Sequence, residues 1–362
     1  MGRRTPARAR GARAGSFGVR CLSLKAGVDA RDETDLRSGG SWTLTQRAKN
    51  DVLWALASLF LAGARNLPVG ALRRLGRGLG LAAHALGRGP RRTAEANVRR
   101  VFPDLDASGR ARLVRRCFAT LGEMLGETVG SLRLRGAPPL LEISREAHAI
   151  LSDARREGRG VVFPSAHLGP WERVAASLVG AGIPLVTLAR ESYDPRFSRL
   201  YDELRGAKGV GVVWRSSPGA AARILRTLRA GHVLGIPMDL SSRVECCDAA
   251  FLGHPASTPV GPARIALRTG SPVVVGTAAP HPTAVVDSAC PQGAWIVTAT
   301  RIRTDDLAGD PGGAVELTRR INSELSRRIL AAPHAWVWMH DRWSGEEEAP
   351  NRGMVRPRGE RS

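Results

Sequence analysis

The hydrophobic positions divide the chain into two parts. Between about residues 69 and 135, apolar residues recur every three or four positions, which is the period of amphipathic helices. Beyond about residue 140, apolar runs alternate with helical stretches near 171–180, 195–206, 217–230, 258–269 and 313–330. The runs are GVVFPS (160–165), IPLVTLA (183–189), VGVVW (210–214), HVLGIPM (232–238), SPVVVGTA (271–278) and WIVTAT (295–300). This alternation predicts an α/β fold with a largely parallel central sheet flanked by helices.

Two N-terminal segments have the character of helices at a membrane surface. Residues 52–64 form the most apolar run, yet a spanning helix needs about 20 apolar residues, so an interfacial or re-entrant helix is expected. Residues 69–92 place arginines between leucines, which favours a basic amphipathic helix on anionic lipid, although a surface helix packed on the core has the same pattern. Residues 93–135 predict two helices separated by FPDLDASGR, with Ser108 as an N-cap.

The positive charge of the chain indicates an anionic partner. The formal net charge is +21, and all but three of the 54 basic residues are arginines. A GC-rich genome raises the arginine content whatever the function, so the charge alone does not choose between an anionic membrane and nucleic acid. Aromatic residues make up only 5%, and no run interleaves arginines with stacking rings. This composition argues against nucleic acid as the anionic partner.

The cysteines predict neither a metal site nor a disulfide framework. Five cysteines occur, and none belongs to a CxxC pair. This usage fits a reducing, cytoplasmic environment for the catalytic part. We expect no metal and no bound cofactor.

His167 is the first candidate for catalysis. An apolar strand leads into it, and the turn at Gly169 and Pro170 opens a helix, so His167 lies at the carboxyl end of a parallel strand. Glu172, in the first helical turn, is expected to curl back and hold one ring nitrogen, leaving the other as a base. The amides near Gly169 and Trp171 are candidates to stabilise an oxyanion. A structural histidine would look the same. A serine hydrolase is not indicated, because no GxSxG surrounds the serine two residues earlier.

Three later segments hold candidate substrate-binding residues. Arg190 ends the next strand and suits a phosphate or carboxylate, although a surface ion pair would explain it equally. Asp239 ends a further strand. The stretch 251–264 reads as a tight loop rich in glycine and proline, followed by a helix near Pro259.

Together, in this order, these pieces resemble the bacterial late acyltransferases of lipid A biosynthesis. That family shares its fold and a His-x4-Asp/Glu motif with the glycerophosphate acyltransferases. The resemblance runs from about residue 45 to about residue 345 and includes the motif from His167 to Glu172. It also includes Arg190, Asp239 and the pattern from Phe251 to Ala266. Further matches are Asn97, Phe102, Pro103, Glu127, Trp336, Trp338, His340, Arg342 and Trp343.

The resemblance implies an enzyme that moves a fatty acyl chain from an acyl carrier protein or CoA thioester to a hydroxyl of a lipid A precursor. His167 and Glu172 are then the catalytic pair. Substrate-binding residues would be Arg190, Asp239, Gly253, Thr258, Gly261 and Arg264. The implied partners are an acyl donor, a glycolipid acceptor and an anionic membrane surface, without nucleic acid. The implied location is the inner (cytoplasmic) membrane, with the catalytic domain facing the cytoplasm.

The sequence departs from the family at two places, and several functions therefore stay open. Pro170 replaces the usual asparagine, and the segment 241–250 is not the family's usual sequence. Both departures bear on the acceptor and the chain length rather than on the reaction. A phosphatidylinositol mannoside-type acyltransferase shares much of the central pattern. A non-catalytic lipid-binding relative, a nucleic-acid-binding protein and a lipid hydrolase also stay open.

These observations divide the chain into four regions. Residues 1–45 are expected to be a disordered basic arm or the product of a mis-assigned start codon. Residues 46–135 form the membrane-associated helical region, and residues 136–345 form the acyltransferase catalytic domain. Residues 346–362 are expected to be a flexible tail.

Overall fold

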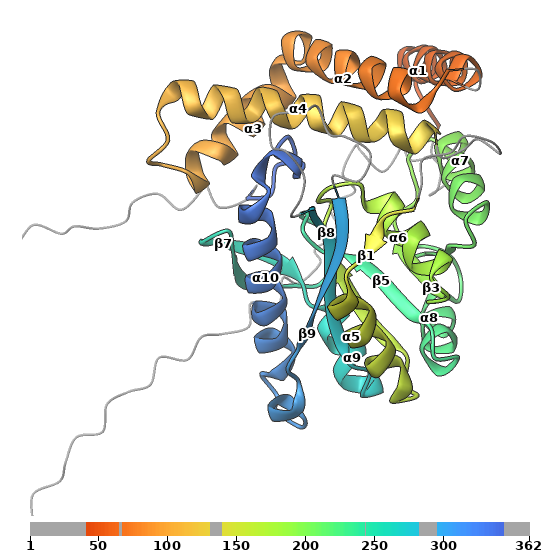
Figure 1. Ribbon diagram of the computed structural model, residues 1–362, viewed down its shortest axis with the longest axis vertical. Coiled ribbons are helices and arrows are strands. Elements are labelled where there is room, and N and C mark those ends of the chain that lie inside the picture. The colour runs from red at the N-terminus through yellow and green to blue at the C-terminus, as the bar shows by residue number, and fades with distance from the viewer. Residues whose placement is uncertain (1–40, 65–66, 131–139, 243, 282–294, 344–362) are drawn as a thin grey trace, which may run out of the picture.

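An α/β body carries a layer of N-terminal helices across one end of its sheet (Figure 1). The computed structural model describes residues 41–64, 67–130, 140–242, 244–281 and 295–343. Most of the predicted arm and the whole predicted tail lie outside these residues, and the division into four regions stays a prediction. The helices of the layer are α1 (Leu44–Ala64), α2 (Val69–Leu86), α3 (Arg88–Val101) and α4 (Ala107–Gly130).

The central sheet has seven strands in the order β1-β9-β8-β2-β5-β3-β4. Neighbours pair in parallel except β8 and β9, which are antiparallel. Each of the six predicted apolar runs coincides with a strand, so the prediction of an α/β fold with a largely parallel sheet is confirmed. The strands are β1 (Glu142–Ile143), β2 (Val161–Ser165), β3 (Leu185–Ala189), β4 (Gly211–Trp214), β5 (Val233–Pro237), β8 (Val273–Pro280) and β9 (Trp295–Ile302).

In the part of the chain that the structure describes, six further helices connect or cover these strands. Several begin where the sequence supplies a cap: Ser144 accepts a hydrogen bond from the N–H of Ala147, and Asp194 caps a helix whose first residue is Pro195. The helices are α5 (Arg145–Arg156), α6 (Trp171–Gly180), α7 (Pro195–Gly206), α8 (Ala220–Arg229), α9 (Gly261–Thr269) and α10 (Gly313–Ala331), with short turns η2 (Asp305–Leu307) and η3 (Pro333–Ala335).

Glycines let α2 and α4 cross at very close range. A Cβ placed on Gly76 would lie 2.1 Å from the carbonyl oxygen of Gly122, and one on Gly126 would lie 2.2 Å from that of Leu72. Glu127 of α4 adds an ionic contact, because it pairs with Arg73 of α2 at 3.2 Å and with Arg173 of α6 at 2.6 Å. The helical layer is therefore joined to the helix that follows the candidate active-site loop.

Two predictions for the N-terminal helices are wrong in detail. The single helix predicted for residues 69–92 is broken at Gly87. Pro90 lies in the first turn of α3, and a proline inside a continuous helix would lose a hydrogen bond and clash with the preceding turn. The predicted N-cap Ser108 lies inside α4 instead. Asp106 does the capping, since its carboxylate accepts from the N–H of Gly109 at 2.7 Å.

The stretch predicted as a loop before α9 contains an antiparallel hairpin, β6 (Cys246–Phe251) and β7 (His254–Pro259). Its two-residue turn is Leu252-Gly253, and both residues have positive φ, 51° and 83°. Turns of this kind favour Asn-Gly or Asp-Gly. The Leu-Gly pair therefore gave no hairpin signal.

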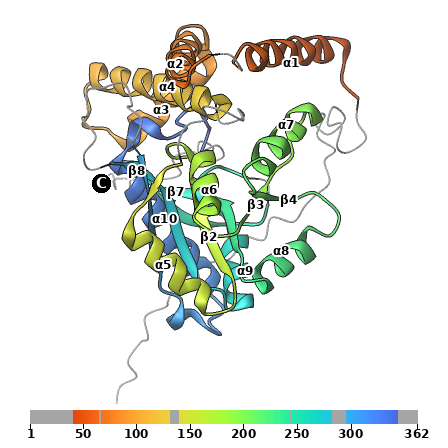
Figure 2. The same cartoon turned by 45° about the vertical axis from the view of Figure 1, so that its right-hand side comes forward.

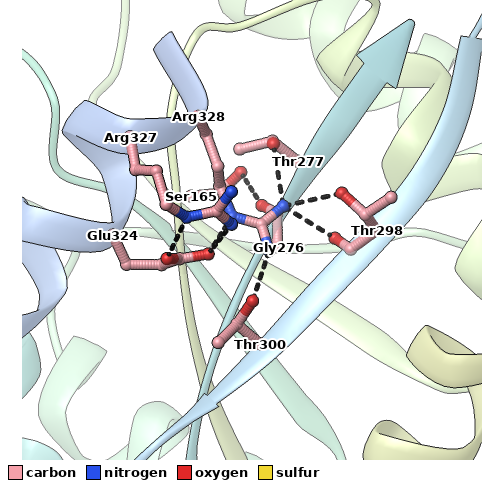
Figure 3. Close-up of polar contacts among 8 residues, drawn as sticks. All are labelled: Ser165, Gly276, Thr277, Thr298, Thr300, Glu324, Arg327 and Arg328. Atoms are coloured by element: carbon pink, nitrogen blue, oxygen red, sulfur yellow. Dashed lines mark hydrogen bonds and ion pairs between the residues drawn. The ribbon is translucent and has the colours of Figure 1, made fainter. Parts of the chain in front are cut away.

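A buried arginine holds α10 against the antiparallel strands β8 and β9 (Figure 3). The Nε of Arg328 lies 2.7 Å from a carboxylate oxygen of Glu324 on the same helix. Its remaining nitrogens donate to groups on β8 and β9, namely the Thr277, Thr298 and Thr300 hydroxyls and the Thr298 carbonyl. Because both charged groups are almost fully buried, this contact fixes the position of α10 rather than forming a surface ion pair.

Across the residues that the structure describes, no helix has both the length and the apolarity to cross a membrane. The association of the N-terminal helices with a membrane is therefore still a prediction.

Candidate active site

The loop that carries His167 is held by the segment around η3. Leu168 pairs with Trp336 in an antiparallel bridge, and the N–H of Gly169 donates to the carbonyl of Ala335 at 3.1 Å. Gly169 has a φ of +65°, a conformation that favours glycine. The chain therefore turns sharply after the imidazole before α6 begins.

Asp239 is the carboxylate that contacts His167. It follows β5, the neighbour of β2, and is completely buried. Its Oδ1 lies 3.0 Å from Nδ1 of His167, and its Oδ2 accepts from the backbone N–H of His167 at 2.9 Å. The indole N–H of Trp336 donates to the same Oδ2 at 2.8 Å. Since a carboxylate only accepts, His167 carries its proton on Nδ1 and leaves Nε2 as the basic nitrogen.

The two groups shift one another's ionisation in opposite directions. Burial alone would lower the pKa of His167, but the charge of Asp239 and the hydrogen bond to it outweigh burial and raise that pKa above its ordinary value. Burial would likewise raise the pKa of Asp239, but His167 and Trp336 lower it. Asp239 therefore stays ionised and favours the imidazolium form of His167.

Glu172 does not occupy the place predicted for it. It lies in the first turn of α6 and forms a bidentate pair with Arg205 of α7, with N–O distances of 3.0 and 2.7 Å. Its charge still helps to raise the pKa of His167, but the hydrogen bond to the ring comes from Asp239. The prediction that Glu172 orients the imidazole is corrected on this point. Arg205 could not be predicted from the sequence, because a single arginine on a surface-like helix gives no signal.

His167 lines a pocket of about 980 Å³ at the carboxyl ends of the parallel strands. Arg190 and Arg215 lie in its exposed rim, and Arg190 stacks on the ring of Tyr193 with a distance of 4.5 Å. Buried apolar side chains line the opposite end. The pocket thus combines a basic nitrogen, a cationic rim and an apolar interior.

Four other predicted binding residues lie outside the wall of this pocket. Gly253 lies in the hairpin turn, and Gly261 is the first residue of α9. Thr258 is buried, and its hydroxyl accepts from Asn322 and Arg342. Arg264 forms an exposed ion pair with Glu245. The two motif residues with polar side chains therefore support the hairpin and the chain around it.

The predicted oxyanion donors are both engaged. The N–H of Gly169 donates to Ala335, and the N–H of Trp171 donates to the carbonyl of Gly169 at 2.9 Å. Trp171 instead presents its ring edge-on to His167, with ring centres 5.2 Å apart. In this arrangement neither amide has a free hydrogen for a substrate oxygen.

The C-terminal tryptophan motif completes the site. Trp336 and Trp338 are fully buried, and their rings pack edge to face at 4.8 Å. His340 accepts from the N–H of Ser241, two residues after Asp239. The sequence indicates these residues by resemblance only, and in the structure Trp336 and His340 hold the loop of Asp239 in place.

Among the described residues, no group of three or more His, Cys, Asp or Glu side chains is placed to hold a metal ion. Cys117, Cys246 and Cys247 are free thiols.

Comparison with known proteins identifies a family. A family model described as bacterial lipid A biosynthesis acyltransferase matches residues 45–344, which include the N-terminal helices, the sheet and the tryptophan motif. No curated protein matches the chain. Because the match extends over most of its length, the chain belongs to the bacterial lipid A biosynthesis acyltransferase family and is an acyltransferase.

Proposed function

We propose that this acyltransferase moves a fatty acyl chain from an acyl carrier protein or CoA thioester to a hydroxyl of a lipid A precursor. The observation that carries the proposal is the His167–Asp239 pair in the wall of a pocket with an apolar interior and a cationic rim. His167 serves as general base, and Asp239 orients it.

The proton moves through Nε2 of His167. A hydroxyl is too weak an acid to ionise near neutral pH, so it needs a base while it attacks. Its oxygen bonds to the thioester carbonyl carbon as its proton passes to Nε2, and Asp239 stabilises the imidazolium that forms. The C–S bond then breaks, and the departing thiolate takes the proton from the imidazolium. No acyl-enzyme is required, because the thioester is already an activated acyl donor.

The cationic rim suits an anionic headgroup or carrier. The guanidinium of Arg190 is planar and permanently charged, so it can hold a phosphate of the acceptor bidentately. Arginines elsewhere on the surface would attract an acidic carrier protein. Position and charge support these proposed roles.

The N-terminal helices are proposed to rest on the cytoplasmic face of the inner membrane. Several leucines of α1 are exposed, among them Leu53, Leu56 and Leu59, and α2 exposes Leu75 and Leu79. In Figure 2, α1 extends to one side of the helical layer, above α7. Exposed leucines next to arginines suit a helix lying in the interface of an anionic leaflet.

The test is acyl transfer by membranes that contain the protein, with a labelled acyl-carrier-protein thioester and a lipid A precursor. His167→Ala should lower transfer at least about a hundredfold. Transfer to a mannosylated phosphoinositide instead would change the acceptor and leave the chemistry intact. Undiminished transfer by His167→Ala would contradict the proposed mechanism.

A further inference from the structure

One end of the pocket lies between α6 and the sheet and is lined by buried apolar side chains. Phe163, Leu178 and Leu185 line this end and are at most 3% exposed. At the opposite end, Tyr193 and Tyr201 are 51% and 44% exposed. The part of the pocket between the exposed rim and these buried side chains beside α6 is a channel.

The floor of the channel is one face of three adjacent strands. Successive side chains of a strand point to opposite faces, so Phe163, Leu185 and Gly235 share the face toward α6. In the register of the sheet, Gly235 of β5 pairs with Phe163 of β2 on one side and with Thr187 of β3 on the other. From above, Val174, Ala175 and Leu178 line the channel at helical spacing.

Gly235 keeps the middle of this floor open. A Cβ built there would meet its nearest neighbours, on Thr187 and Leu185, at 3.6 Å or more, which is ordinary contact. The ring of Phe163 lies over Gly276 on the other side of β2, where an added Cβ would be 2.2 Å from the ring. The one large side chain beside Gly235 on β2 is thus turned away from it.

We propose that Gly235 sets the length of the acyl chain by leaving room for it on the floor of the channel. This inference rests on the proposed acyl transfer. Leu185 and Ala189, at the two ends of β3, both line the channel. Because a strand rises about 3.3 Å per residue, the channel extends about 13 Å along β3. An extended hydrocarbon advances about 1.3 Å per carbon, given bonds of about 1.5 Å. The channel therefore fits a saturated chain on the order of ten carbons.

The test is the substitution Gly235→Leu, which places a branched apolar side chain on the floor of the channel. Transfer would be measured with a series of saturated acyl thioesters from hexanoyl to octadecanoyl. We expect the preferred chain to shorten by about two carbons or more and transfer of the chain preferred by the wild type to fall at least about tenfold. Gly206→Leu is the matched control, because nothing lies within 4 Å of a Cβ there and Gly206 is outside the channel.

A binding measurement that needs no acyl transfer distinguishes a failure of this inference from a failure of the proposed function. Non-reactive thioether analogues of the same lengths would be titrated against wild type and Gly235→Leu. A shift in the preferred length without any transfer would support the channel and contradict the transfer proposal. An unchanged length preference in a folded Gly235→Leu variant would overturn the inference. If that variant does not fold, Gly235→Ala adds a methyl group in ordinary contact and must shift the preference in the same direction.

Discussion

Nδ1 of His167 lies 3.0 Å from Oδ1 of Asp239, although 72 positions separate the two residues in the chain. The register of the sheet explains the contact. Ser165 of β2 pairs with Pro237 of β5, and each is followed two residues later by one member of the pair. Because adjacent parallel strands end at the same edge, the two side chains meet there.

Asp239→Asn should lower kcat by about a hundredfold or more, since the amide neither stabilises the imidazolium nor fixes the proton on Nδ1. The acid limb of the pH profile should move as well. Asp239 raises the pKa of His167, and the base is active only when neutral, so activity of the wild type falls as the pH drops through that raised pKa. Without the carboxylate, the limb should shift to lower pH. A kcat profile across that limb for both proteins checks this, and an unmoved limb would contradict the orienting role.

Glu172→Gln should also shift the acid limb of the pH profile to lower pH, but by less than Asp239→Asn does. Glu172 raises the pKa of His167 through its charge alone, whereas Asp239 also forms a hydrogen bond to the ring. The comparison needs pH profiles of both single variants under one set of conditions. A larger displacement in Glu172→Gln than in Asp239→Asn would show that Glu172 is the main partner of the imidazole after all.

The Glu172–Arg205 pair should behave as one unit. Both side chains are at most 15% exposed, so removing one leaves the other charge poorly compensated. Arg205→Met and Glu172→Gln should each lower activity, and the double variant should lose much less than the sum of the two effects. A double-mutant cycle on kcat/KM measures the coupling. Additive losses would mean that the pair does not act jointly in catalysis.

The sequence was sufficient to predict six strands of the central sheet, the helices from α6 onward that alternate with them, and the place of His167 after β2. The strands are continuous apolar runs, and the helix after His167 opens with a proline, so both signals are local. The partner of His167 was assigned wrongly. Five residues separate His167 from Glu172, which made the pair conspicuous, while Asp239 depends on β5 lying next to β2. Strand order is a property of the whole sheet, and no local pattern reveals it.

The residues of the 251–264 motif show a second reason why the site could not be fully predicted from the sequence. Thr258 and Arg342 meet in the interior at 2.7 Å, although the sequence separates them by 84 positions. A buried polar group needs a partner. A motif can therefore be characteristic of a family because of packing, and its spacing does not distinguish packing from substrate binding.

The exposed leucines of α1 should govern binding to lipid. Replacing Leu53, Leu56 and Leu59 by serine removes apolar surface and should weaken binding to vesicles containing anionic lipid, at about 1.5 kcal/mol or more for each leucine that becomes buried in the bilayer. Sedimentation with vesicles measures it. Leu330 on α10 is 45% exposed and lies outside the N-terminal layer, so Leu330→Ser is the control. Equal losses in both variants would remove the assignment of α1 as the membrane-facing helix.

Glu324→Gln should destabilise the fold by about 3 kcal/mol near neutral pH, because it leaves Arg328 buried without its carboxylate. Burial alone would raise the pKa of Glu324, but its hydrogen bonds with Arg327, Thr300 and Arg328 and the charge of Arg328 lower it to about 2. A carboxyl with a depressed pKa stabilises the fold above its unfolded pKa, and this contribution is lost as the pH falls through the folded value. The difference in the free energy of unfolding between wild type and Glu324→Gln should therefore narrow as the pH falls from about 5 towards 2. Urea unfolding over this range measures this difference.

Glu316→Gln on the same helix is the control, since Glu316 is 40% exposed and its ion pair with Arg320 should contribute less than about 1 kcal/mol. An equal loss in the two variants, or a gap that does not change with pH, would show that the buried pair does not hold α10 on the sheet.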